Sequence, residues 1–147
     1  MSTLGRGFDG LKGGRERMKI ISKGTLVNEL VDHPPYETNP ELHAKLNIIY
    51  LSPDGRTAIA YYEAPEGWFD VEVKDFDEID YILEGEVELI SADRRLTAAP
   101  GDCFMIQDGD KLRWQMNKPS KMFFVLHTQS EEVKEFIAQL VRKVSSG

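Results

Sequence analysis

Phe76–Leu89 of this chain reads F-D-E-I-D-Y-I-L-E-G-E-V-E-L, with apolar and polar residues alternating along most of its length. Successive side chains of a β-strand point to opposite faces, so the alternation predicts strands with one buried face and one polar face. Glu84-Gly85-Glu86 interrupts the pattern, and we predict two strands joined there. The stretch therefore indicates a β-sheet protein.

A second block follows the same plan downstream. Pro100-Gly101-Asp102 predicts a turn, Cys103–Ile106 is an apolar run, Asp108-Gly109-Asp110 predicts another turn, and Leu112–Met116 resumes the strand pattern. Short turns of this composition between strand patterns are typical of hairpins. We predict that both blocks are hairpins of one sheet.

The two blocks resemble the two motifs of the cupin superfamily, which are small antiparallel β-barrels. The resemblance lies in Y-I-L-E-G-E-V-E-L at Tyr81–Leu89 and P-G-D-C-F-M-I-Q-D-G at Pro100–Gly109. More narrowly, D-E-I-D-Y-I-L-E-G-E at Asp77–Glu86 is similar to the EutQ-like cupins of bacterial ethanolamine-utilisation operons. The resemblance covers roughly Leu42 to Thr128 and implies an all-β, single-domain jelly-roll barrel, or double-stranded β-helix. It implies less about the reaction, because one barrel fold hosts many chemistries.

The composition fits one domain outside the membrane. A chain of 147 residues is long enough for one sound core. No apolar run approaches the roughly 20 residues that span a bilayer, and Met1–Arg17 has no apolar segment typical of a secretory signal. Cys103 is the only cysteine, so no internal disulfide forms. We therefore expect a cytoplasmic protein without a membrane partner.

The net charge of −7 is unevenly distributed. Residues 1–23 carry six basic and two acidic side chains, a net +4, which leaves −11 for the remainder. Phosphate would be repelled by such an acidic body, so we expect no nucleic-acid partner. Residues 1–17 are rich in glycine and predict a flexible basic arm, residues 18–129 the barrel, and residues 130–145 a C-terminal helix.

The first half of the barrel contains one clear hairpin. Leu46–Leu51 and Thr57–Glu63 are joined by S-P-D-G, in which proline presets φ and glycine accepts a positive φ. Met18–Ile21 and Thr25–Val31 predict short strands before it. His33-Pro34-Pro35-Tyr36 predicts an extended linker, since proline disfavours helix at and before its own position.

The C-terminal segment predicts an amphipathic helix capped by Ser130. Its apolar side is formed by Val133, Phe136, Ile137, Leu140, Val141 and Val144. This side has to be buried, either on the outer wall of the barrel or in a dimer contact. We expect a homodimer formed by sheet edges, with the helix as cover.

The resemblance also bears on metal binding, because most catalytic cupins hold a divalent metal with three His and one Glu. Of these positions, only the Glu is kept, as Glu78. The other positions fall on Glu72 and Lys74, or Val71 and Val73, and on Leu112. Lysine, valine and leucine supply no ligand atom here. We therefore predict no metal and no other cofactor, with His43 or His127 beside Glu78 as an alternative, atypical metal site.

If Glu78 points into the barrel, as the resemblance implies, alternation turns Asp80 inward too. Neighbouring carboxyls resist ionising together, so Glu78 and Asp80 could supply an acid and a base, with Lys74 as their electrostatic partner. The remaining inward residues would bind substrate: Glu72, Ile82, Leu112, Trp114 and Met116. Alternatively, the charged residues lie on a solvated outer face.

These residues predict a metal-independent acid/base enzyme of the lyase, isomerase or cyclase type, acting on a small polar organic molecule. The first alternative is a binding or accessory protein of an ethanolamine-utilisation-like pathway, without chemistry of its own. A further alternative is a metalloenzyme with atypical ligands.

Overall fold

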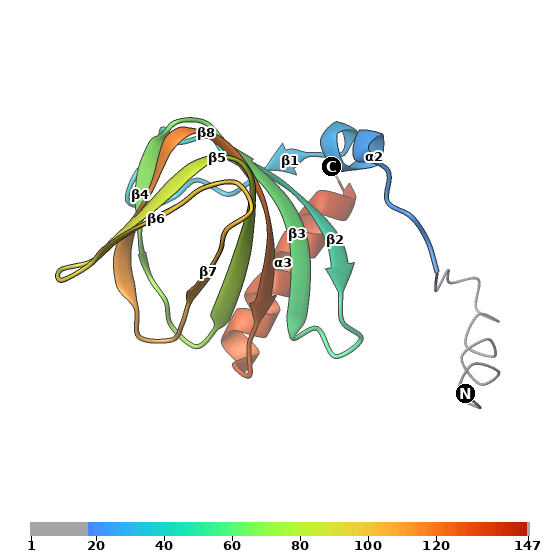
Figure 1. Cartoon of the computed structure of the whole chain (residues 1–147). Coiled ribbons are helices and arrows are strands. Elements are labelled where there is room, and N and C mark those ends of the chain that lie inside the picture. Colours follow the sequence, from blue (N-terminus) through green and yellow to red (C-terminus); the bar gives the residue numbers. More distant parts are fainter. Residues whose placement is uncertain (1–17, 147) are drawn as a thin grey trace, which may run out of the picture.

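The computed structural model describes residues 18–146 (Figure 1), so the arm predicted at residues 1–17 lies outside the described residues. The elements in chain order are α2 (Lys23–Asn28), β1 (Val31–Asp32), β2 (Lys45–Leu51), β3 (Thr57–Ala64), β4 (Gly67–Glu72), β5 (Asp77–Ile90), β6 (Arg95–Ala98), β7 (Cys103–Ile106), β8 (Lys111–His127) and α3 (Glu131–Ser146). The chain is thus almost entirely β-sheet with a C-terminal helix.

The strands form one antiparallel sheet folded into a barrel. Its main path runs β1-β2-β3-β8-β5-β6, with β4 added to β8 and β7 added to β5. β5 and β8 pair along most of their lengths and are shared by both walls of the barrel. One wall continues into β3, β2, β1 and β7, and the other into β4 and β6. The predicted all-β jelly-roll barrel with a C-terminal helix is confirmed.

The long strands correct two local predictions. Asp77–Ile90 is one bent strand of 14 residues, not two strands forming a hairpin. Cys103–Ile106 pairs with β5, not with the strand that follows it. In a jelly roll, strands close in sequence lie in different walls, so turn residues alone do not identify the pairing partner. The hairpin of β2 and β3 is confirmed.

The N-terminal prediction also differs from the structure. Lys23–Asn28 forms a helix where part of a strand was predicted, because the Ser22 side chain caps it by accepting a hydrogen bond from the Thr25 N–H, 3.1 Å away. Asn47 on β2 donates to the Thr25 carbonyl at 3.3 Å and ties this helix to the sheet. No helix in the described part of the chain is long and apolar enough to cross a membrane.

The helix α3 packs on its own barrel. Ser130 caps it, with the Val133 N–H donating to the Ser130 Oγ at 3.3 Å. Ile137 is buried, and Leu140 packs against the core. Figure 1 shows α3 running beside β2 and β3. It packs on the inner side of these strands and not on the outer wall, because its apolar residues lie against inward-facing side chains such as Leu46.

Candidate functional site

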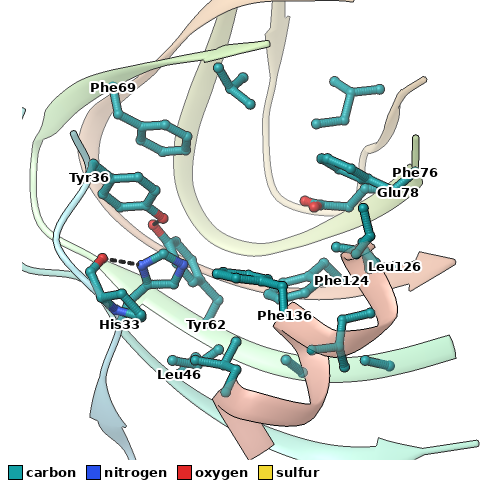
Figure 2. Close-up of a pocket in the computed structure, with 18 of the residues that line it drawn as sticks. His33, Tyr36, Leu46, Tyr62, Phe69, Phe76, Glu78, Phe124, Leu126 and Phe136 are labelled. Atoms are coloured by element: carbon teal, nitrogen blue, oxygen red, sulfur yellow. Dashed lines mark hydrogen bonds between the residues drawn. The ribbon is translucent and has the colours of Figure 1, made fainter. Parts of the chain in front are cut away.

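A cavity of about 680 Å³ lies inside the barrel. Its walls come from inward side chains of β2, β3, β4, β5, β7 and β8, and its mouth from α3 and His33–Glu37. Figure 2 shows Phe136 of α3 at the mouth, near Phe124 of β8. This volume is typical of a small-molecule site.

An aromatic wall forms one side of the cavity. Tyr36 stacks on Phe69 with ring centroids 4.0 Å apart, and Phe69 stacks on Trp114 at 5.3 Å. Phe104 meets Trp114 edge to face at 5.0 Å. The Trp114 side chain is only 4% exposed, and its Nε1–H has no hydrogen-bond acceptor among residues 18–146. A buried donor without a partner is costly, so this wall offers a hydrogen bond to a ligand or a water.

Two carboxyl groups lie on the inner face of β5. Asp80 is 0% exposed, and neither of its oxygen atoms has a hydrogen-bond partner of ordinary geometry within the described chain. Burial raises the pKa of Asp80 well above its ordinary range, and the nearby Glu78 carboxyl raises it further. Burial also raises the pKa of Glu78, although its interaction with Asp80 opposes that shift. No basic side chain contributes to either shift, so both carboxyls hold a proton more tightly than an exposed carboxyl does.

Two tyrosines lie near the carboxyl pair. The Tyr36 and Tyr62 hydroxyl oxygens are 2.7 Å apart and share a hydrogen bond. Burial raises the pKa of both, and the charges of Glu78 and Asp80 act on both in the same direction. Both phenols therefore stay protonated at neutral pH. Figure 2 shows these tyrosines on the same cavity as Glu78.

His33 supports the first tyrosine. Its ring stacks on that of Tyr36 with centroids 4.5 Å apart and 15° between the planes. Its Nδ1 lies 2.7 Å from the Pro34 carbonyl oxygen (Figure 2), and since a carbonyl only accepts, Nδ1 carries a proton. In a neutral ring the lone pair then lies on Nε2. The segment predicted as a linker is a wall of the site.

Some of the predicted site residues line the cavity, and others are part of the packed core. Glu78, Asp80 and Trp114 line the cavity. Ile82 and Met116 face inward but are fully buried in the packed core, and they do not line it. Leu112 likewise packs against the core. Direct contact of a ligand with these last three residues is therefore not supported.

The inward orientation predicted for Glu72 is wrong. Glu72 is exposed, and the inward residues of β4 are Phe69 and Val71. The register pairs Phe69 with Trp114 and Glu72 with Lys111, so Glu72 lies on the outer face. The sequence does indicate this orientation. Phe69, Val71 and Val73 alternate with three charged residues, which predicts that the apolar residues face inward and the charged ones outward.

Lys74 lies at the rim of the cavity and not beside the carboxyl pair. The side chain is exposed, although it lines the mouth. The inward residues of this segment are Val71 and Val73, so Lys74 points outward like Glu72. Lys74 therefore can meet only the outer end of a ligand.

The metal-binding residues of other cupins have no equivalent in this cavity. The inward residues at the first two His positions are Val71 and Val73, neither of which supplies a ligand atom. His43 and His127 are exposed, and His127 Nδ1 bonds Thr57 Oγ1 at 2.7 Å on the opposite face from Glu78. Within residues 18–146, no three His, Cys, Asp or Glu side chains are grouped to hold a metal. The residues do not fit the metal of the fold family.

Sequence patterns alone did not identify four of the cavity residues: His33, Tyr36, Tyr62 and Phe136. His33 and Tyr36 lie in the loop between β1 and β2, and Tyr62 follows Tyr36 by 26 residues, so no local pattern joins them. Phe136 is exposed yet lines the mouth, since the helix covers the cavity and not the outer wall. Only the long-range packing of the fold places these side chains on the same cavity as Glu78 and Asp80.

The raised pKa of Asp80 predicts that stability falls with rising pH. Below about pH 4, folded and unfolded chains both hold the proton; above it the unfolded chain releases the proton first. Stability is therefore lost from about pH 4 up to the raised folded pKa. Asp80→Asn should remove this loss. The free energy of unfolding of the variant minus that of wild type should therefore be larger at pH 8 than at pH 4, by about 1–3 kcal/mol.

Urea unfolding of wild type and Asp80→Asn at both pH values measures this difference. Asp70→Asn is the control, because Asp70 is exposed and its pKa is lowered by Arg113. Its effect should be small and of opposite sign. If the difference in the free energy of unfolding between wild type and Asp80→Asn is the same at pH 4 and at pH 8, Asp80 ionises as readily in the folded protein as in the unfolded chain.

Comparison with known proteins supports the fold described above. The family described as "Ethanolamine utilisation protein EutQ" matches residues 12–130. The EutQ protein of Clostridium difficile is 24% identical, over 64% of this chain and 75% of that chain, with a TM-score of 0.55. The EutQ protein of Salmonella typhimurium is 20% identical, over 69% and 80%, with a TM-score of 0.58.

A third solved structure is KdgF from Halomonas, with 13% identity over 74% of this chain and 96% of that chain and a TM-score of 0.56. At these identities the structures support the fold and not the reaction. No curated protein matches the chain. The EutQ match spans well over half of the residues, so this chain belongs to the EutQ family and is a small-molecule-binding cupin.

Proposed function

We propose that the barrel cavity is a metal-independent acid/base site in which Glu78 and Asp80 transfer protons to and from a small organic substrate. The observation that carries this proposal is Asp80, which is fully buried at the cavity beside Glu78 and has no hydrogen-bond partner of ordinary geometry in the described chain. A buried carboxyl kept next to a second one is a costly arrangement for stability alone. It is a common arrangement where an acid and a base are needed together.

The chemistry that fits this pair is proton transfer at a carbon next to a carbonyl. The ionised carboxyl takes the C–H proton, while the protonated carboxyl donates its proton to the carbonyl oxygen, giving an enol. Return of a proton to a different carbon isomerises the substrate; loss of a leaving group instead makes the reaction a lyase step. The Tyr36–Tyr62 pair supplies a second hydrogen-bond donor for the oxygen.

The apolar walls constrain the substrate. Phe69, Val71, Phe124 and Leu126 make much of the inner cavity apolar and favour a neutral carbonyl compound with an apolar part. Lys74 at the rim can contact a polar or anionic group at the outer end of the molecule. Burial of the reacting atoms strengthens each hydrogen bond that the carboxyls make.

Hydrogen exchange tests this function without knowledge of the natural substrate. The protein is incubated in D₂O with a panel of small ketones, aldehydes and 2-oxo acids, and loss of the α-proton is followed by ¹H NMR. At least one compound should exchange about 100-fold faster than in buffer. Binding without faster exchange, across the panel, would favour a binding protein.

Metal content is a separate expected result. Since valine and leucine occupy the ligand positions, purified protein should contain well under one equivalent of iron, manganese or zinc. Elemental analysis of protein purified without added metal measures this content. Near-stoichiometric metal that disappears in Glu78→Gln would contradict the metal-independent site.

The second candidate is a binding or accessory protein of an ethanolamine-utilisation-like pathway, expected in the cytoplasm. Membership of the EutQ family favours it. The two functions differ in what they require of the cavity. A binding protein should keep its affinity in Asp80→Asn or Glu78→Gln and lose it in Trp114→Ala, which removes wall surface and leaves the carboxyls in place.

A further inference from the structure

Four aromatic side chains form a stacked column along one side of the cavity. The His33 ring stacks on Tyr36 with ring centroids 4.5 Å apart, Tyr36 stacks on Phe69 at 4.0 Å, and Phe69 stacks on Trp114 at 5.3 Å. The planes of successive rings differ by 15°, 12° and 24°. Figure 2 shows the rings of His33, Tyr36 and Phe69 following one another in this order. All four residues line the cavity, and we call their rings the aromatic column.

The inner rings of the aromatic column meet the cavity with their edges. Two rings cannot stack on the same face at these distances, so Tyr36 lies between His33 and Phe69. For the same reason, Phe69 lies between Tyr36 and Trp114. Both faces of each inner ring are therefore covered, and a ligand can touch only the edges. The edge of an aromatic ring carries partial positive charge, so this side of the cavity favours an electron-rich atom such as oxygen.

Trp114 places a hydrogen-bond donor at the end of the aromatic column. Its side chain is 4% exposed, and it packs on Phe69 and on Phe104, whose ring centroid lies 5.0 Å away. The Nε1–H finds no acceptor anywhere between residues 18 and 146. An unpaired buried donor lowers stability, and a phenylalanine used only for packing would avoid that cost. The acceptor of this hydrogen bond therefore has to come from the contents of the cavity.

One ligand can reach both Trp114 and the carboxyl pair. Phe104 is paired in strand register with Asp80, and its ring contacts that of Trp114 edge to face. Among the described residues that line the cavity, only Asp80 and Trp114 have buried side-chain polar atoms without a hydrogen-bond partner of ordinary geometry. A ligand that satisfies both must carry two oxygen atoms. The oxygen at Trp114 has to be uncharged, because Glu78 and Asp80 would repel a carboxylate and Lys74 reaches only the rim.

We propose that Trp114 is a specificity-determining residue, whose Nε1–H binds a second, neutral oxygen atom of the substrate while the carbonyl oxygen lies at Glu78 and Asp80. The substrate class is then an aliphatic carbonyl compound with a second acceptor oxygen, such as an alkoxyketone or a hydroxyketone. A plain alkanone leaves the Nε1–H unpaired and binds more weakly. This assignment rests on the proposed function, because the carboxyl pair holds the first oxygen.

Three pairs of neutral probes test this preference, and in each pair one oxygen atom replaces one CH₂ group. The pairs are methoxyacetone and 2-pentanone, 4-methoxy-2-butanone and 2-hexanone, and 5-methoxy-2-pentanone and 2-heptanone. Dissociation constants are measured by NMR titration of the ¹⁵N-labelled full chain. In at least one pair, the Kd of the alkanone divided by the Kd of the methoxy compound should fall about fivefold from wild type to Trp114→Phe, which lacks the N–H.

Trp68→Phe is the matched control, because it makes the same chemical change outside the cavity. Trp68 lies next to the inward Phe69 on β4, and its ring contacts the Arg113 guanidinium, whose central carbon is 4.0 Å from the ring centroid. The ratio of the two Kd values should stay within about twofold of wild type in this variant.

The indole N–H signals give a reading that does not require Trp114→Phe to fold. The chain has two tryptophans, so the ¹H–¹⁵N spectrum contains two indole signals, and Trp68→Phe identifies the one from Trp114. In wild type, the Trp114 signal should move downfield when the methoxy probe binds, since its N–H then donates to an oxygen. It should move less with the matching alkanone, and the Trp68 signal should stay in place.

The outcomes separate the role of Trp114 from the proposed function. A Trp114 signal that moves without any α-proton exchange would support the donor role and contradict the acid/base function. Exchange that is equally fast on both members of every pair, in wild type and in Trp114→Phe, would contradict the donor role alone. A Trp114 signal that stays in place while a probe binds would overturn that role and indicate a water retained at Nε1. Failure of all six probes to bind at millimolar concentration would overturn the substrate class.

Discussion

Gly85→Ala is expected to lower the free energy of unfolding by about 4 kcal/mol or more. Gly85 lies where β5 bends from one wall into the other, with a φ of 93°. A Cβ there would lie 2.2 Å from the Ser120 Oγ and 2.5 Å from the Pro119 carbonyl oxygen. The backbone of β8 cannot move away without breaking the pairing of the two long strands. Urea unfolding at neutral pH measures the loss.

Gly101→Ala separates the clash from the backbone strain. Gly101 has the same φ of 93°, but no atom lies within 4 Å of the position its Cβ would take. Its substitution should cost only about 1–2 kcal/mol. Equal losses at the two sites would mean that strands β5 and β8 do not approach closely at Gly85.

Asp80→Asn and Glu78→Gln should each lower catalysed α-proton exchange by about 100- to 10,000-fold. Either change removes one member of the pair that must hold both a proton and a negative charge. The variants keep the size of the side chain, so the barrel should fold. The rate is measured by ¹H NMR in D₂O, on the probe that wild type exchanges fastest.

The matched control for this loss is Glu72→Gln, the same chemical change on the outer face of β4. It should leave the exchange rate within about twofold of wild type. A similar loss in Glu72→Gln would point to a general effect of charge. Full activity in both Asp80→Asn and Glu78→Gln would remove the carboxyl pair from the mechanism.

The fold could be predicted because the sequence around β5 contains both a strand pattern and a family resemblance. Alternation through Ile79, Tyr81 and Leu83 identified the strand, but it did not identify which face is buried. All three lie partly exposed on the outer face, and the charged Glu78 and Asp80 lie inside. In this half of β5, the usual arrangement is therefore reversed: the apolar side chains face outward and the carboxyl groups face the interior of the barrel.

The site was harder to predict because long-range pairing brings it together. The resemblance placed Glu78 inside, and alternation added Asp80; both line the cavity. The prediction failed for Lys74 because Val71 and Val73 are the inward residues of this segment, so that Lys74 points outward like Glu72. Tyr62 could be identified only from its contact with Tyr36, which depends on the packing of the N-terminal segment against the barrel.

The carboxyl ¹³C NMR titration of aspartate-labelled protein tests the central claim most directly. The Asp80 signal is assigned by its absence in Asp80→Asn. If the pair shares a proton in the closed barrel, this signal should still be shifting above about pH 6, and Glu78→Gln should lower its midpoint, because the neighbouring charge is removed. An Asp80 signal that is fully ionised by about pH 5, unchanged in Glu78→Gln, would contradict an acid/base pair in the cavity.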